Sequence, residues 1–223
     1  MKISQRQEAL KKLYFLKAVG YKFINENFIN LYQSGEFSDL NELNKQISHC
    51  ALCALRKTAN RTILGLGDKS SKVMFVSLAP SISEDQEGEH LCGMAGIKLC
   101  EMIYNSLGLK KGEFYISSIL RCKFLPNEAQ NAATNECFEL CRPYLLEEIR
   151  LLKPKVIVAL GEQVFLNLYP ESLLKNSFES IRGSVLKFGD ISVMPTYSHV
   201  WLMKNPSFES VFLDDLRKIK GMI

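Results

Sequence analysis

The sequence predicts an α/β protein built on a parallel sheet with helices on both faces. Short apolar runs of strand length alternate along the chain with longer segments whose apolar residues recur at helical spacing. Parallel strands need crossover connections, and the intervening helices fill that role by packing on the two faces of the sheet. We therefore expect a three-layer α/β/α sandwich around a four-stranded parallel sheet.

Four core strands are expected from nearly continuous apolar runs. The first run reads KVMFVSL and the third reads KVIVALG, which is typical of strands covered on both faces. The segment 185–188 is predicted to form one arm of a hairpin beside the last core strand. The four core strands are expected at 72–78, 114–120, 155–161 and 191–196.

Helices are expected between and after these strands. In the segment 95–107, Ile97, Cys100 and Ile103 are expected to face inward, and Gly108 is expected to end the helix. The other helices of the domain are expected at 135–152, 162–169 and 207–220.

Residues 1–40 are expected to form a helical N-terminal extension, and residues 41–223 the α/β domain. Apolar residues at helical spacing within 4–33 predict one or two amphipathic helices that end near Gly35. A short helix follows, with Ser38 as its expected N-cap. Its apolar face is expected to hold Leu40, Leu43 and Ile47.

The composition is that of a globular protein without a membrane segment. Hydrophobic residues make up 47% of the chain and charged residues 23%. No apolar run reaches the roughly 18 residues that a bilayer requires, and the polar start does not resemble a signal peptide. We expect a cytoplasmic monomer. The net charge of +4 permits contact with nucleic acid but does not by itself argue for it.

The most informative residues are cysteines in two widely separated groups. Cys50 and Cys53 form a CxxC motif, Cys122 closes a predicted strand, and Cys141 lies in a predicted helix. In a reducing cytosol such residues are metal ligands or core residues more often than disulfides. Four thiolates suit zinc or a 4Fe–4S cluster, and the spacing alone does not choose between the two metals. Cys137, one helical turn before Cys141, is a rival fourth ligand.

Around these cysteines a series of short motifs follows one order along residues 43–221. The motifs are ISHCALC at 47–53, LGLGD at 64–68, Ala79-Pro80, Glu84-Asp85, GMAG at 93–96, Arg121-Cys122, CRPYL at 141–145, PKVIVALG at 154–161, Arg182-Gly183, PTY at 195–197 and Asn205-Pro206. In this order they resemble the motifs of the family 4 uracil-DNA glycosylases, the iron–sulfur members of the uracil-DNA glycosylase superfamily.

The resemblance implies a fold, a partner and a cofactor. It implies a uracil-DNA glycosylase-like domain that binds single-stranded or damaged DNA in base excision repair. It also implies a 4Fe–4S cluster, zinc being the alternative, on Cys50, Cys53, Cys122 and Cys141. In this family the base is flipped out of the stack, and the glycosidic bond breaks as the base leaves as an anion. An acid, a stacking ring, an amide and a histidine that donates to a base oxygen are then expected.

This chain departs from the family at each of those four positions. The acid falls on Leu78 and the stacking phenylalanine on Leu91. The base-reading asparagine falls on Ser118, and the histidine falls on Ser198. Because leucine cannot activate water or offset a cation, uracil excision is expected to be feeble or absent. The residues expected to line the base site are Leu78, Ala79, Pro80, Ser81, Leu91, Ser118 and Ser198.

The leading candidates to replace the missing groups are Asp85, His90 and His199, and Glu84 and Glu87 are further possible replacements. Asp85 and His90 follow the first strand, and His199 lies one residue after the family's histidine position. Asp85 has a second interpretation as a loop brace or helix cap. With these residues the chain would excise uracil weakly or remove another damaged base. The alternatives are an inactive protein that binds DNA or abasic sites, and a redox or zinc-stapled protein without DNA.

The DNA contacts are expected from the loop after the last strand and from the segment after the CxxC motif. In the loop, Trp201 or Leu202 would act as a wedge or stacking platform and Lys204 would contact phosphate, unless Trp201 or Leu202 packs against the sheet. Arg56 and Arg61 follow the CxxC motif. Further basic residues that could form a rim are Lys69, Lys72, Lys110, Lys111 and Arg121.

Overall fold

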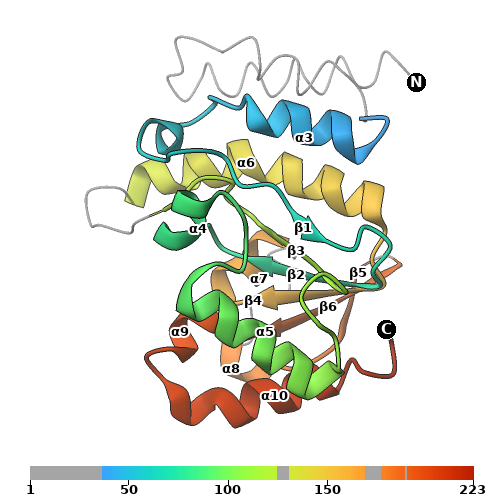
Figure 1. The fold of residues 1–223 in the computed structure, drawn as a ribbon. Helices are drawn as coiled ribbons and strands as arrows, with labels where there is room; N and C mark the ends of the chain where they lie inside the picture. Colours follow the sequence, from blue (N-terminus) through green and yellow to red (C-terminus); the bar gives the residue numbers. More distant parts are fainter. Residues whose placement is uncertain (1–36, 125–130, 169–176, 189) are drawn as a thin grey trace.

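A computed structural model describes residues 37–124, 131–168, 177–188 and 190–223 (Figure 1). The helices expected within 4–33, their end near Gly35 and the last residue of the helix expected at 162–169 lie outside the described residues. None of the helices in the described segments is long and apolar enough to cross a membrane.

The sheet has six strands in the order β1-β3-β2-β4-β6-β5. The four central strands, β3, β2, β4 and β6, run parallel, which confirms the predicted four-stranded parallel sheet. Two short antiparallel strands extend it: β5 pairs with β6 as the predicted hairpin, and β1 pairs with β3. The strands are β1 Leu66–Gly67, β2 Val73–Ser77, β3 Tyr115–Ser118, β4 Val156–Leu160, β5 Leu186–Phe188 and β6 Ile191–Thr196.

Helices cover both faces of this sheet (Figure 1). On one face lie α3 and α6, and on the other lie α5 and α10. The helices are α3 Leu40–Ser48, α4 Ile82–Glu87, α5 Gly93–Leu107, α6 Asn131–Leu152, α7 Glu162–Leu168, α8 Phe178–Ile181, α9 His199–Leu202 and α10 Glu209–Arg217, with 3-10 turns η1 Ala54–Lys57 and η4 Pro206–Phe208. This is the expected three-layer sandwich.

The side chains of each strand point alternately to the two faces of the sheet, so the protein has two hydrophobic cores, one on each face. Met74 and Val76 of β2 face the core beneath α3 and α6, whereas Val73 and Phe75 face the core beneath α5 and α10. Because successive side chains of a strand point to opposite faces, a buried run must be apolar throughout. This explains why the predicted strands showed no polar alternation.

Two details of the predicted helices are wrong. The N-cap of α3 is Asp39, whose side chain accepts from the N–H groups of Asn41 and Glu42; Ser38 instead donates its hydroxyl to Glu42 over 2.8 Å. Ile97 of α5 is 57% exposed, because Leu99, Met102 and Ile103 form the buried face of that helix.

Candidate functional site

The loops that carry the candidate residues meet at one edge of the sheet. Strands β2, β3, β4 and β6 are parallel, so their carboxyl ends lie side by side. The short helix α4 follows β2 and α9 follows β6, and both lie at that edge in Figure 1. This is the edge at which open α/β sheets bind ligands.

Glu84 holds both ends of the loop that follows β2. Its Oε2 accepts from the N–H of Ser81 over 2.7 Å, and its Oε1 accepts from the N–H of Leu91 over 2.8 Å. Ser81 accepts in turn from the N–H of Glu84, which completes a capping box at the start of α4. Burial raises the pKa of Glu84, but His90 and these hydrogen bonds outweigh burial and lower it to about 2. Glu84 is therefore an ionised carboxylate.

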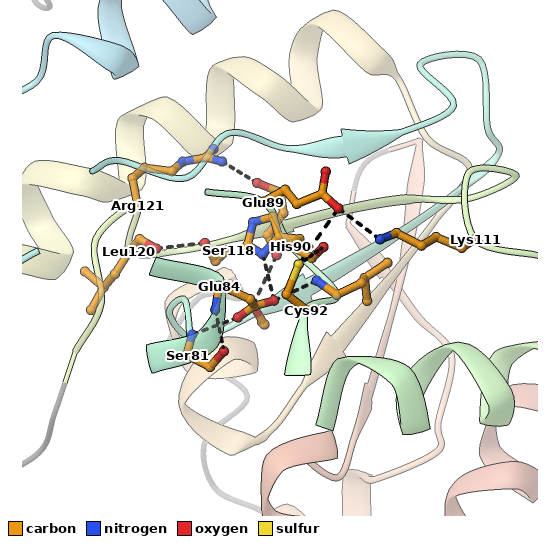
Figure 2. A network of polar contacts seen from close by, with 12 residues as sticks. Ser81, Glu84, Glu89, His90, Cys92, Lys111, Ser118, Leu120 and Arg121 are labelled. Carbon is orange, nitrogen blue, oxygen red and sulfur yellow. Dashed lines mark hydrogen bonds and ion pairs between the residues drawn. The ribbon is translucent and has the colours of Figure 1, made fainter. Parts of the chain in front are cut away.

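One buried histidine contacts this carboxylate, and the pKa of a second buried histidine is influenced by its charge. Nδ1 of His90 lies 3.4 Å from Oε1 of Glu84, and Figure 2 shows this contact within the same polar network as Ser81. Burial lowers the pKa of His199 to about 4; nearby Glu84 opposes this shift and His90 adds to it. His90 contacts Glu84, and both residues influence the pKa of buried His199, so we call the three residues the two-histidine site (Glu84, His90 and His199).

Each histidine has a ring nitrogen without a partner among the described residues. Nε2 of His90 and Nδ1 of His199 are both buried and make no hydrogen bond there. A buried polar atom without a partner costs roughly 1–3 kcal/mol. Such atoms are a frequent mark of a place where a ligand or water completes the hydrogen bonding. Two of the three leading catalytic candidates are thus buried histidines with a ring nitrogen that has no partner among the described residues.

Asp85 does not belong to this site. It is fully buried, its Oδ1 accepts from the N–H of Asn60 over 2.9 Å, and its Oδ2 accepts from Nζ of Lys123 over 2.9 Å. Both oxygens are used to join α4 to the segments that follow the CxxC motif and Cys122. These contacts support the interpretation of Asp85 as a loop brace, and its catalytic role stays a prediction.

Four of the expected base-site residues are apolar. Leu78 and Ala79 are half-buried, Pro80 is buried, and Leu91 is buried with φ of 65°. A positive φ is unfavourable for leucine, so the surrounding structure must hold it. Gly96 permits this arrangement, because a Cβ there would lie 2.5 Å from the carbonyl carbon of Leu91.

The three serines at expected base-site positions already make hydrogen bonds within the protein. Ser81 caps α4 as described above. Ser118 is buried and donates its hydroxyl to the carbonyl of Leu120 over 2.7 Å, a contact drawn in Figure 2. Ser198 is the N-cap of α9 and accepts from the N–H of Trp201. None of them offers a carboxylate or an amide.

The fold gathers five cysteines beside α6. Cys50 and Cys53 lie between α3 and η1, Cys122 follows β3, and Cys137 and Cys141 project from α6. A hydrogen bond between the thiols of Cys53 and Cys137 lowers the pKa of Cys53. Burial, together with Cys53 and Cys50, raises the pKa of Cys122 to about 12. The four predicted ligands therefore lie near one another, with Cys137 among them.

The cysteine thiols are suitable ligands for a metal centre, although their side chains are not arranged in metal-binding geometry. In the described part of the chain no three His, Cys, Asp or Glu side chains stand together in metal-binding geometry. The backbone N–H of Arg121 nevertheless donates to Sγ of Cys141 over 3.3 Å, and such N–H···S bonds surround cluster thiolates. Closely spaced buried thiols lose their protons when they bind metal.

A buried ionic network lies next to the cysteines, since it includes Arg121, the neighbour of Cys122. The sequence does not reveal this network. Arg121 and Glu148 are both fully buried and form an ion pair of 2.6 Å. Glu148 also accepts from the hydroxyls of Tyr115, over 2.8 Å, and Ser117, over 2.6 Å. Arg121 is therefore no part of a basic rim on the surface, contrary to the expectation, because its guanidinium is needed inside.

The expected DNA-contact residues divide into exposed and buried ones. Trp201 is 40% exposed and stacks on Tyr197 with ring centroids 4.9 Å apart. Leu202 is 5% exposed and packs in the core beneath α5, so it is not available as a wedge. The difference arises because Trp201 and Leu202 are successive residues of α9 and therefore project from different sides of this helix. Lys204 is exposed.

The basic segment after the CxxC motif lies partly against the protein. Arg56 is half-buried and donates to the carbonyl of Ala59 over 2.9 Å. Arg61 is exposed, and its guanidinium lies against Gly88. Of the other lysines, Lys111 pairs with Glu89 over 3.1 Å, as Figure 2 shows.

Comparison with known proteins agrees with this fold. The model of the uracil DNA glycosylase superfamily matches residues 64–217, so the chain belongs to that superfamily. Within it, the relatives are type-4 uracil-DNA glycosylases, the iron–sulfur type. The enzyme of Sulfurisphaera tokodaii is 30% identical over 190 residues, covering 82% of this chain and 84% of the relative.

Two further relatives carry the same name. The type-4 uracil-DNA glycosylase of Archaeoglobus fulgidus is 30% identical over 187 residues, covering 81% of this chain and 91% of the relative. That of Thermotoga maritima is 29% identical over 184 residues, covering 81% and 93%. The resemblance noted from the motifs is thus confirmed.

Proposed function

We propose that this protein is a DNA glycosylase of base excision repair with a remodelled base-binding site. The observation that supports it is the two-histidine site at the carboxyl edge of the sheet, where His90 and His199 each keep a buried ring nitrogen free for a ligand. The superfamily supplies the reaction class, hydrolysis of the bond between base and sugar. Leu78 and Ser198 stand where an acid and a histidine were expected, so excision of uracil is weak or absent.

The residues of the site bind and orient a flipped base. Leu78 and Leu91 supply apolar surface, and the open nitrogens of His90 and His199 supply the polar contacts. His199 is uncharged near neutral pH because its pKa is about 4. Glu84 fixes the ring of His90, since a carboxylate that accepts from Nδ1 sets the orientation of the imidazole.

A 4Fe–4S cluster completes the proposal. Cys50, Cys53, Cys122 and Cys141 would hold it, and when bound it cross-links α3, η1, the end of β3 and α6. Asp85 adds a second link between the same loops through Asn60 and Lys123. We assign the cluster a structural role, because the two-histidine site contains none of these cysteines.

DNA binding is proposed for the surface around α9. Trp201, together with exposed Val200 and Met203, offers a stacking platform, and Lys204 offers charge to phosphate. Arg61 offers a second basic contact. Single-stranded or damaged DNA fits such a surface, because a base must leave the duplex before it can reach the site. We infer that one copy of the chain suffices.

The decisive experiment is a cleavage panel. Strands with a single uracil, hypoxanthine, xanthine or alkylated purine are incubated with the cluster-loaded protein, and abasic sites are cleaved and counted. We expect excision of at least one base, lost in His199→Ala and retained in Asp85→Asn if that variant stays folded. Absence of cleavage on every strand would refute the glycosylase function.

The alternative is a protein that binds DNA or abasic sites without catalysis. The absence of an acid at position 78, of an amide at position 118 and of a histidine at position 198 favours this alternative. It predicts that His199→Ala leaves every measured property unchanged except binding. Tight binding to an abasic strand, with no cleavage of any damaged strand, would support it.

A further inference from the structure

The two-histidine site offers a hydrogen-bond acceptor through His90. Glu84 is ionised and can only accept, so Nδ1 of His90 must be the donor in their contact. In the neutral imidazole the other nitrogen, Nε2, then carries a lone pair. This atom is buried and has no partner among the described residues. When His90 is uncharged, a base bound there meets an acceptor and must present an N–H group.

Ser118 offers a second acceptor. Its single hydroxyl proton is used in the 2.7 Å hydrogen bond to the carbonyl of Leu120, so only lone pairs remain. Leu78 and Leu91 carry no polar side-chain atoms. Among these residues and the two-histidine site, His199 alone can still supply a free N–H. The set is therefore poor in donors, whereas a base that leaves as an anion needs donors on its oxygens.

Both carboxylates near the site are buried, and each of their oxygens already accepts a hydrogen bond. Both oxygens of Glu84 bind the loop after β2, and both oxygens of Asp85 bind Asn60 and Lys123. Because both are buried and held by these contacts, we expect neither to activate water or to balance a cationic sugar. The cleavage must then depend on a base that is a good leaving group by itself.

Resting on the glycosylase function proposed above, we propose that this site takes N-alkylated purines, whose base carries a positive charge within the DNA. The C1′–N9 bond breaks with its electron pair going to N9, so the purine leaves uncharged. Water bonds to C1′ and its proton goes to solvent, which leaves an abasic site. The N–H and amino groups of an alkylated guanine or adenine donate to Nε2 of His90 and Oγ of Ser118.

The test compares bases released from three DNA substrates. DNA treated with a methylating agent, DNA containing uracil and DNA containing hypoxanthine are each incubated with cluster-loaded protein, and released bases are identified by chromatography and mass spectrometry. We expect release of methylated purines above the spontaneous rate and slower release of uracil and hypoxanthine. His90→Ala should lower the release of methylated purines by about tenfold, the typical effect of one lost hydrogen bond.

Two further variants keep this test interpretable. His90→Gln restores an acceptor oxygen and should recover part of the release, which a purely structural role of His90 would not produce. Tyr104→Ala, on the exposed face of α5, should release bases at the unchanged rate. Visible absorption of the cluster and the thermal unfolding temperature check that each variant is folded.

The contrary outcomes separate this inference from the proposed function. Faster release of uracil or hypoxanthine than of methylated purines would overturn the alkylated-purine assignment and leave the glycosylase function intact. Equal release by His90→Ala and the parent protein would overturn the role of the His90 acceptor. No release from any DNA would overturn the glycosylase function and this inference together.

Discussion

Glu84 is the residue on which the candidate site depends most directly. It binds the N–H groups of Ser81 and Leu91 and contacts His90, so one carboxylate sets both ends of a loop and one imidazole. The Ser81-x-x-Glu84 spacing is a capping-box signal that can be read in the sequence. The contacts to Leu91 and His90 cannot be read there, because they depend on how the loop folds back.

The pKa of Glu84 predicts a loss of stability in acid. Its folded pKa of about 2 lies below the reference value of 4.5, so its contribution to the free energy of unfolding is complete above pH 4.5. The contribution decreases as the pH falls toward 2, because the unfolded state binds the proton first. Glu84→Gln should therefore destabilise the protein at neutral pH, and the difference from the parent should shrink in acid, as measured by denaturant titration.

Glu87→Gln is the matched control for this prediction. Glu87 lies on the same helix but is exposed, so its substitution should change stability little at any pH. A pH-independent difference between Glu84→Gln and the parent would contradict the role of the carboxylate charge.

We predict that the His199 side chain titrates at a lower pH than an exposed histidine. Its pKa is lowered from 6.5 to about 4 by burial, so the folded protein keeps this ring neutral where an exposed histidine is charged. Between those two values the unfolded chain binds a proton that the folded chain does not, and stability falls as the pH falls. Proton NMR of the ring signals, with His199→Ala to identify the resonance, measures the pKa directly. A value near 6.5 would show that the ring is solvated.

At the scale of elements, α6 decides how the cysteines meet. Cys137 and Cys141 lie one turn apart and both face the loop that carries Cys50 and Cys53. A helix therefore supplies two thiols to one place, which the CxxC motif alone does not reveal. The N–H of Arg121 donates to Sγ of Cys141, and this favours Cys141 as the fourth ligand.

If Cys141 rather than Cys137 is the fourth ligand, the variants Cys141→Ser and Cys137→Ser should contain different amounts of iron and sulfide. Cys141→Ser should lose most of the bound iron and the visible absorption of the cluster, because three thiolates remain. Cys137→Ser should keep both, since it removes only a neighbouring thiol. Iron and sulfide analysis of protein purified without air measures this directly. The reverse pattern would make Cys137 the ligand, and zinc without iron in the parent protein would refute the cluster.

In the molecule as a whole, three exposed apolar side chains lie at the edge of the sheet that carries the site. Val200 and Trp201 belong to α9, which follows the last parallel strand, and Met203 is its C-cap. The superfamily fold brings this helix and the loop after β2 to the same edge. Leu202 belongs to the core instead, so the surface contact rests on Trp201.

Binding to single-stranded DNA should depend on both stacking and charge. Trp201→Ala should weaken binding by about 1–3 kcal/mol, the usual cost of losing one stacked base. Lys204→Gln should weaken it less and reduce the salt dependence by about one phosphate contact. Fluorescence anisotropy at several salt concentrations measures both effects. Unchanged affinity in Trp201→Ala would place the DNA elsewhere.

The local pattern of the chain was sufficient for the layers and for the family. Strand β2 and strand β4 were predictable because a strand buried on both faces must be apolar along its whole length. The short strand β1 was not, because two residues carry no periodic signal. The ordered motifs identified the superfamily, since they mark the loops and ligands that the fold requires.

The sequence by itself determined the α/β sandwich, the superfamily and the residues to examine. The contacts of these residues depend on the folded chain. Folding brings His90 into contact with Glu84, buries Leu202 in the core, and uses both oxygens of Asp85 as hydrogen-bond acceptors. The physical reason is that periodicity and spacing act along the chain, whereas hydrogen bonding and burial of these side chains depend on segments that meet only after folding.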